Sequence, residues 1–133
     1  MKRWIAAIMA GLLAVAIGGC KSTSPAAKPA RSSPPGPITL SDAEKSIVER
    51  DTIASLPDVR AGTFRTISAA RGTDGRVTVC GYINITSSAG VSSGDTPFIG
   101  ELAGGAFQMS AIGGSSEETI AVQSECQQNR VYI

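Results

Sequence analysis

Prolines confine the folded part of this chain to its C-terminal portion. Residues 21–38 are rich in Ser, Ala and Pro and carry five of the seven prolines in the 133-residue chain. A segment of this composition cannot bury an apolar core, and its prolines favour an extended conformation of ~3.1 Å per residue. The sequence therefore predicts a semi-rigid spacer there, with a proline-rich recognition motif as the alternative. One small domain is left for residues 39–133.

The segment before the spacer has the layout of an export signal. Two basic residues open it, an apolar run spans residues 4–17, and two glycines follow. As a helix this run measures about 21 Å, which is shorter than the ~30 Å hydrocarbon core of a bilayer. We therefore expect residues 1–19 to be a signal peptide rather than a transmembrane helix.

The end of this signal, Ile17-Gly18-Gly19-Cys20, resembles the lipobox of bacterial lipoproteins. In that motif a branched apolar residue and two small residues precede the cysteine that becomes the new N-terminus. The resemblance implies that the Cys20 thiol carries a diacylglycerol, so that residues 20–38 hold the domain on a membrane through lipid. The alternative is that Cys20 is a spare thiol beside an ordinary cleavage site.

Lys21 indicates which bacterial membrane would hold the lipid anchor. It occupies the position where an aspartate marks inner-membrane lipoproteins of enteric bacteria. The resemblance therefore favours the outer membrane of the bacterial cell envelope, with the domain facing the periplasm.

Composition excludes several classes of function. The chain has no histidine, and its 12 basic residues nearly balance its 11 acidic ones. Without histidine the chain can form neither a Ser-His-Asp or Cys-His catalytic arrangement nor an imidazole metal site. A net charge near zero also argues against binding to nucleic acid, which requires a basic excess. We expect no cofactor and no metal.

Two capping boxes predict the helices of the domain. In each box a serine hydroxyl accepts the backbone N–H three residues on, and a glutamate there reaches back to the serine N–H. The boxes are Ser41 with Glu44 and Ser115 with Glu118, and the predicted helices are residues 42–54 and 117–127. Residues 119–122 could equally form a strand.

Alternation predicts a central strand at residues 76–86. Apolar residues and a glycine, at 77, 79, 81, 83 and 85, point to one face; Thr78, Cys80, Tyr82, Asn84 and Thr86 point to the other. Residues 63–69 predict a neighbouring strand, and residues 97–103 and 106–112 predict a hairpin around two glycines. Residues 87–96 are expected to form a Ser/Gly loop. The predicted fold is α+β, with one or two helices covering one face of a small antiparallel sheet of about four strands.

Two cysteines remain for the domain once Cys20 is set aside. In an exported protein an even pair favours oxidation, so we expect a disulfide between Cys80 and Cys126. The alternative, a redox role, lacks the Cys-x-x-Cys spacing on which it usually depends.

The segments Phe64-Arg65, Val79-Cys80-Gly81-Tyr82-Ile83-Asn84 and Pro97-Phe98-Ile99-Gly100 resemble a second family. It consists of small, functionally uncharacterised envelope proteins of proteobacteria, and the similarity covers about residues 50–100. The resemblance implies a fold and a disulfide, but it implies no activity.

Two sets of side chains are candidates for function. Tyr82 and Asn84 share a face beside the predicted loop and are candidate ligand-binding residues, although an asparagine there more often bonds to turn backbone. Five acidic residues are candidates for a carboxylate pair, with solvated surface charge as the simpler interpretation: Asp95, Glu101, Glu117, Glu118 and Glu125.

The sequence thus predicts a lipid-anchored protein whose domain is a non-enzymatic binding or envelope-structural module in the periplasm, with a periplasmic protein or another envelope component as its partner. The alternatives are a carboxylate-based hydrolase of the envelope and an inhibitor of an envelope-attacking hydrolase.

Overall fold

The computed structural model describes residues 34–133, so the predicted signal peptide, Cys20 and most of the predicted spacer lie outside the described residues. The elements are β1 (Gly36–Ile38), α1 (Asp42–Ser55), β2 (Val59–Arg71), β3 (Val77–Ser87), β4 (Ser92–Ala103), β5 (Ala106–Ile112) and α2 (Ser116–Gln128). Both predicted helices are confirmed, and each begins at its capping box. None of the helices within residues 34–133 has the length and apolar character needed to span a bilayer.

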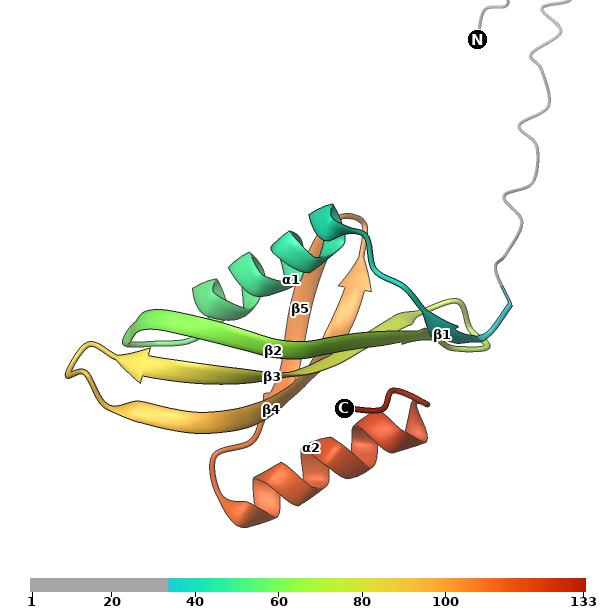
Figure 1. The fold of residues 1–133 in the computed structure, drawn as a ribbon. Coiled ribbons are helices and arrows are strands. Elements are labelled where there is room, and N and C mark those ends of the chain that lie inside the picture. The colour runs from blue at the N-terminus through green and yellow to red at the C-terminus, as the bar shows by residue number, and fades with distance from the viewer. Residues whose placement is uncertain (1–33) are drawn as a thin grey trace, which may run out of the picture. The chain divides into compact units, whose positions relative to one another are not determined.

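The strands form one antiparallel sheet in the order β1-β2-β3-β4-β5 (Figure 1). The α+β class is confirmed, but the sheet has five strands rather than the expected four. The additional strand is β1, which lies in the predicted spacer and pairs with the last three residues of β2. The proline of β1 lies on an edge strand, where its missing N–H costs no ladder hydrogen bond. Because a proline normally argues against a strand, the local sequence did not predict β1.

The two helices cover opposite faces of the sheet (Figure 1), which corrects the expectation that helices cover one face. On one face Val48 of α1 packs into a core with Val79 and Ile83 of β3. On the other, α2 packs over Cys80 of β3 through Cys126. Because β3 carries apolar side chains on one face and a buried cysteine on the other, each face requires its own cover.

Three phenylalanines organise the α1 face. The ring of Phe98 on β4 is met edge-on by Phe64 of β2 and by Phe107 of β5, with centroids 5.9 and 6.1 Å away. Two glycines make room for them, since a Cβ on Gly81 would meet the Phe98 ring and one on Gly100 would meet the Phe107 ring. The edge-to-face geometry adds to the stabilisation that burial of these rings provides.

The α2 face is held by the predicted disulfide, which is confirmed. Cys80 and Cys126 are joined with their Cα atoms 6.2 Å apart, and both are fully buried. The apolar cluster around them is small and consists mainly of Ala70, Ile99, Val122 and Val131. The disulfide therefore fixes α2 to the central strand where little apolar surface is available.

The predicted loop at residues 87–96 is wrong. β3 continues to Ser87 and β4 starts at Ser92, so only residues 88–91 connect them. Serine hydroxyls assist this pairing: the N–H of Ile85 donates to Oγ of Ser93 at 3.0 Å, and the N–H of Val91 donates to Oγ of Ser87 at 3.2 Å. Small polar residues have a weak strand preference, so the local sequence did not indicate this extension.

Candidate functional site

The end of the sheet opposite β1 is a three-stranded ribbon. We call it the distal ribbon and define it as residues 59–65, 83–87 and 92–96. Figure 1 shows it extending past the N-terminal end of α2. One face of the distal ribbon is covered by α1, because a Cβ on Gly62 would meet the side chain of Ile53. The face on the α2 side is therefore the accessible face of the distal ribbon.

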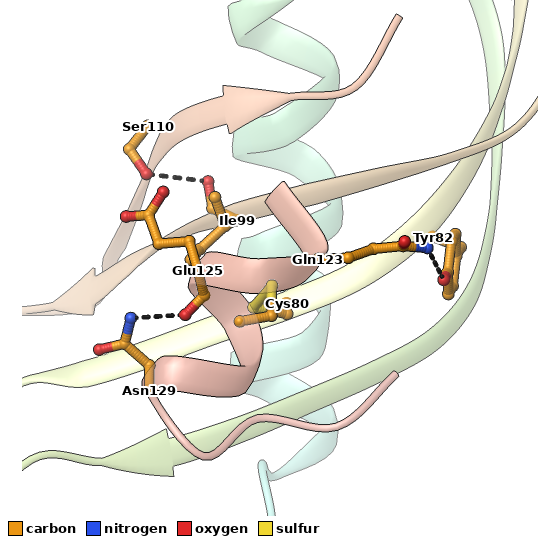
Figure 2. Close-up of a disulfide and its surroundings, with 8 residues drawn as sticks. Cys80, Tyr82, Ile99, Ser110, Gln123, Glu125 and Asn129 are labelled. Atoms are coloured by element: carbon orange, nitrogen blue, oxygen red, sulfur yellow. Dashed lines mark hydrogen bonds between the residues drawn. A yellow bond between two sulfur atoms is a disulfide. The ribbon is translucent and has the colours of Figure 1, made fainter. Parts of the chain in front are cut away.

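Tyr82, the first predicted site residue, lies where the distal ribbon meets α2. Its hydroxyl oxygen accepts a hydrogen bond of 2.8 Å from Nε2 of Gln123, as Figure 2 shows. The contact joins residues 41 positions apart, so no local pattern in the sequence indicated Gln123. Tyr82 thus fixes the position of α2 beside the distal ribbon.

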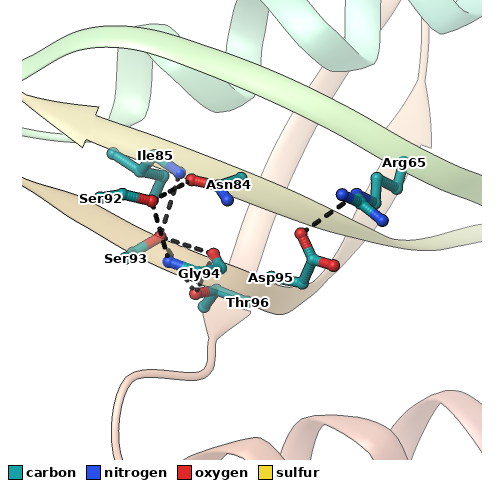
Figure 3. Close-up of polar contacts among 8 residues, drawn as sticks. All are labelled: Arg65, Asn84, Ile85, Ser92, Ser93, Gly94, Asp95 and Thr96. Carbon is teal, nitrogen blue, oxygen red and sulfur yellow. Dashed lines mark hydrogen bonds and ion pairs between the residues drawn. The ribbon is translucent and has the colours of Figure 1, made fainter.

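Asn84, the second predicted site residue, lies on the distal ribbon itself (Figure 3). Its Oδ1 accepts a hydrogen bond of 2.7 Å from the hydroxyl of Ser92 on the neighbouring strand. The side chain therefore helps to hold β3 and β4 together, which matches the structural alternative except that its partner is a side chain. Its amide NH₂ group has no hydrogen bond to any residue within 34–133, and Asn84 is half-buried.

An ion pair that the sequence did not indicate crosses the same face. Nε of Arg65 on β2 lies 3.2 Å from Oδ1 of Asp95 on β4, so the arginine side chain reaches across β3. Because the side chains are 66% and 40% exposed, this pair contributes little to stability. Together with Asn84 it gives the distal ribbon an ordered polar face with donors and acceptors on all three strands.

The five candidate carboxylates do not form one cluster. Asp95 pairs with Arg65, Glu101 pairs with Arg76, and Glu118 belongs to the capping box of α2. Within residues 34–133 no group of three or more Cys, Asp or Glu side chains is placed to hold a metal ion.

A concave feature lies at the other end of the α2 face from the distal ribbon. It is a groove of about 420 Å³, and its lining includes Arg76, Glu101, Glu125 and Asn129. Arg76 pairs with Glu101 at 3.4 Å and with Asp74 at 3.4 Å. The residues that line the groove come from α2, from three strands and from the turn after β2, so no local motif could have indicated the groove.

Three carboxylates act as hydrogen-bond acceptors for the fold. The Ser41 hydroxyl and N–H lower the pKa of Glu44, and the Ser115 N–H and hydroxyl lower that of Glu118. The pKa of Asp51 on α1 is lowered by a hydrogen bond from Arg50 and by the backbone N–H of Phe107.

Comparison of the chain with protein-family models, with curated proteins and with solved structures finds no match. The resemblances to bacterial lipoproteins and to the proteobacterial envelope family stay predictions.

Proposed function

We propose that this protein is a bacterial lipoprotein whose domain is a non-enzymatic binding or envelope-structural module in the periplasm. In this proposal Cys20 carries the lipid and residues 21–35 form the spacer. Because Lys21 rather than aspartate follows the cysteine, the proposed site is the outer membrane.

One observation carries the binding role: the distal ribbon lies at the opposite end of the sheet from the strand that the spacer enters. β1 pairs with the C-terminal end of β2, from Ala69 to Arg71, whereas Val59 at the other end pairs with Ser87. β2 has 13 residues, which at ~3.3 Å per residue separate the two ends by about 40 Å. A domain held from β1 thus presents the distal ribbon away from its attachment.

The chemistry of the distal ribbon supports a protein or polar envelope partner. Asn84, Arg65 and Asp95 present amide, guanidinium and carboxylate groups on an ordered sheet face, and Val91 at the turn is 67% exposed. Interfaces of non-obligate complexes combine such polar groups with a few apolar contacts.

The lipid anchor is tested by intact mass of the membrane-extracted protein, before and after reduction with alkylation. We expect the mass of residues 20–133 plus lipid in the wild type, and no lipid in Cys20→Ala. Two alkylatable thiols should appear only after reduction. A wild-type mass without lipid would contradict the anchor.

The binding role is tested by photo-crosslinking in cells with a photoreactive residue at position 84. Position 49 on α1, where Glu49 is exposed, is the matched control. We expect a discrete crosslinked product from position 84 alone, identified by mass spectrometry. Equal products from both positions, or none from position 84, would contradict a binding face at the distal ribbon.

A further inference from the structure

Among residues 34–133, the only strand beside the outer edge of β2 is β1, and it leaves most of that edge open. β1 pairs with Ala69, Ala70 and Arg71 and ends at Ile38, after which the chain turns into α1. Residues 59–68 therefore pair on one side only, with β3. Within residues 34–133, no hydrogen bond from any other element reaches their backbone. We call residues 59–68 the free edge.

An edge of this length is an unusual feature, because unpaired N–H and C=O groups can pair with another chain. Along an antiparallel strand these groups point alternately toward and away from the existing neighbour, so the free edge offers a series of donors and acceptors. Recognition of an extended peptide by such an edge is a recurrent binding mode in proteins.

The charge of the free edge indicates which chain would pair with it. The free edge carries two arginines, Arg60 and Arg65, and no acidic residue. Arg65 is paired with Asp95 across β3, so Arg60 is the charge that the free edge offers to a partner. Arg60 is exposed and has no carboxylate within 4.0 Å among residues 34–133. A second copy pairing through the same edge would offer Arg60 no opposite charge, because residues 59–68 contain no acidic residue, whereas opposite charges across paired strands are stabilising.

The two irregularities of β2 fall at Arg60 and Arg65. The pairing with β3 shifts between Val59 and Ala61, which flank Arg60, and again between Phe64 and Ile67, which flank Arg65. Bulges redirect side chains and are common next to functional sites. They also discourage indiscriminate pairing along an edge, so that charge can select the partner.

We propose that the free edge is a docking strand for an extended acidic segment of a partner protein, which adds to the sheet beside β2. This inference rests on the binding role proposed above and is independent of the lipid anchor. The backbone of the segment pairs with residues 59–68, and its carboxylates lie near Arg60.

The test uses a ten-residue peptide of alternating Val and Glu, titrated into the ¹⁵N-labelled full chain in non-ionic detergent. Two matched peptides carry Lys in place of Glu, or Pro in place of the two central Val residues. We expect shifts and slowed amide exchange confined to residues 59–68 with the first peptide, and binding at least about tenfold weaker with the other two.

Charge reversal on the protein is the complementary test. Arg60→Glu should weaken binding of the acidic peptide about fivefold, whereas Arg76→Glu, with the same charge change in the groove on the α2 face, should leave it unchanged. The thermal transition of each variant shows whether it remains folded.

Several outcomes would overturn the inference. They are absence of shifts at millimolar peptide, shifts at β5 or the groove instead, equal binding of the lysine peptide, and concentration-dependent self-association through β2. Crosslinking from position 84 tests the binding role separately, so a crosslink there without peptide binding at the free edge removes this inference alone.

Discussion

The outer edges of β2 and β5 contain similar aromatic residues, but they differ in how they are covered. β2 and β5 each contribute one phenylalanine that meets the ring of Phe98 edge-on. On β5, Phe107 is buried, and its outward N–H donates a hydrogen bond of 2.8 Å to Oδ2 of Asp51 on α1. On β2, Phe64 is only half-buried, and neither of the helices described in residues 34–133 donates or accepts a side-chain hydrogen bond at the backbone of the free edge. An edge is closed here by a helix that supplies both apolar cover and an acceptor.

The difference follows from where α1 lies. Its Asp51 side chain reaches the edge at β5, while its Ile53 side chain lies over Gly62 on the face of β2. The same helix thus blocks one edge and covers only the face of the strand at the other. Protection of edges in this domain is therefore asymmetric, and that asymmetry can be tested by mutation.

Removing the aromatic anchor of the closed edge should have the largest effect. Phe107→Ala leaves a cavity beside Phe98 and Gly100 and should lower the free energy of unfolding by about 4 kcal/mol. Phe64→Ala is the matched control at the open edge and should cost less, because Phe64 is less buried. Chemical denaturation of both variants measures this, and equal losses would contradict the asymmetry.

Removing the disulfide should destabilise the domain without altering the contrast between the edges. The Cys80→Ala, Cys126→Ala variant loses a crosslink between residues 46 apart, which should cost about 3 kcal/mol. Hydrogen exchange should show faster exchange in α2, while Phe107 stays protected relative to residues 59–68. Loss of that difference would show that the disulfide, rather than α1, closes β5.

Removing the acceptor from α1 should have a smaller, local effect. Asp51→Ala deprives the N–H of Phe107 of its partner, so this amide should exchange faster by NMR. The loss of global stability should be well below that of either change above. Glu49→Ala on the same helix is the control, since Glu49 is exposed and makes none of the hydrogen bonds to β5.

Lowering the pH should open the β5 edge in the same way as Asp51→Ala does. Near neutral pH this effect should be the smallest of those predicted here. Because the folded pKa of Asp51 is lowered, its contribution to stability is present above its unfolded pKa of about 4 and is lost as the pH falls through the folded pKa. The lowered pKa values of Glu44 and Glu118 act in the same direction. The amide shift of Phe107 should therefore titrate below about pH 4 in the wild type and stay flat in Asp51→Asn.

Local patterns predicted the helices and the central strands well, because capping boxes and alternation act between near neighbours. They could not predict the edges. Asp51 and Phe107 are 56 residues apart, and β1 is a strand only because the end of β2 lies beside it. The extension of β3 to Ser87 and the start of β4 at Ser92 were missed for the same reason, since the serine hydroxyls there bond across the pairing rather than along the chain.

For the candidate site, the sequence predicted which face of the strand each side chain points to, but not which residue it contacts. Alternation placed Tyr82 and Asn84 on one face, whereas the contacts of Tyr82 with Gln123 and of Arg65 with Asp95 depend on how distant elements pack. The free edge was also beyond local prediction. A strand pattern shows neither how long its neighbour is nor where that neighbour ends.

The three-residue pairing of β1 has a mechanical consequence. Gly36 pairs with Arg71 and Ile38 with Ala69, so few ladder bonds hold β1 to β2 against a pull on the chain before Gly36. Once they rupture, Ala69, Ala70 and Arg71 join the unpaired edge of β2. Tension would thus lengthen the unpaired edge of β2 from ten residues to thirteen.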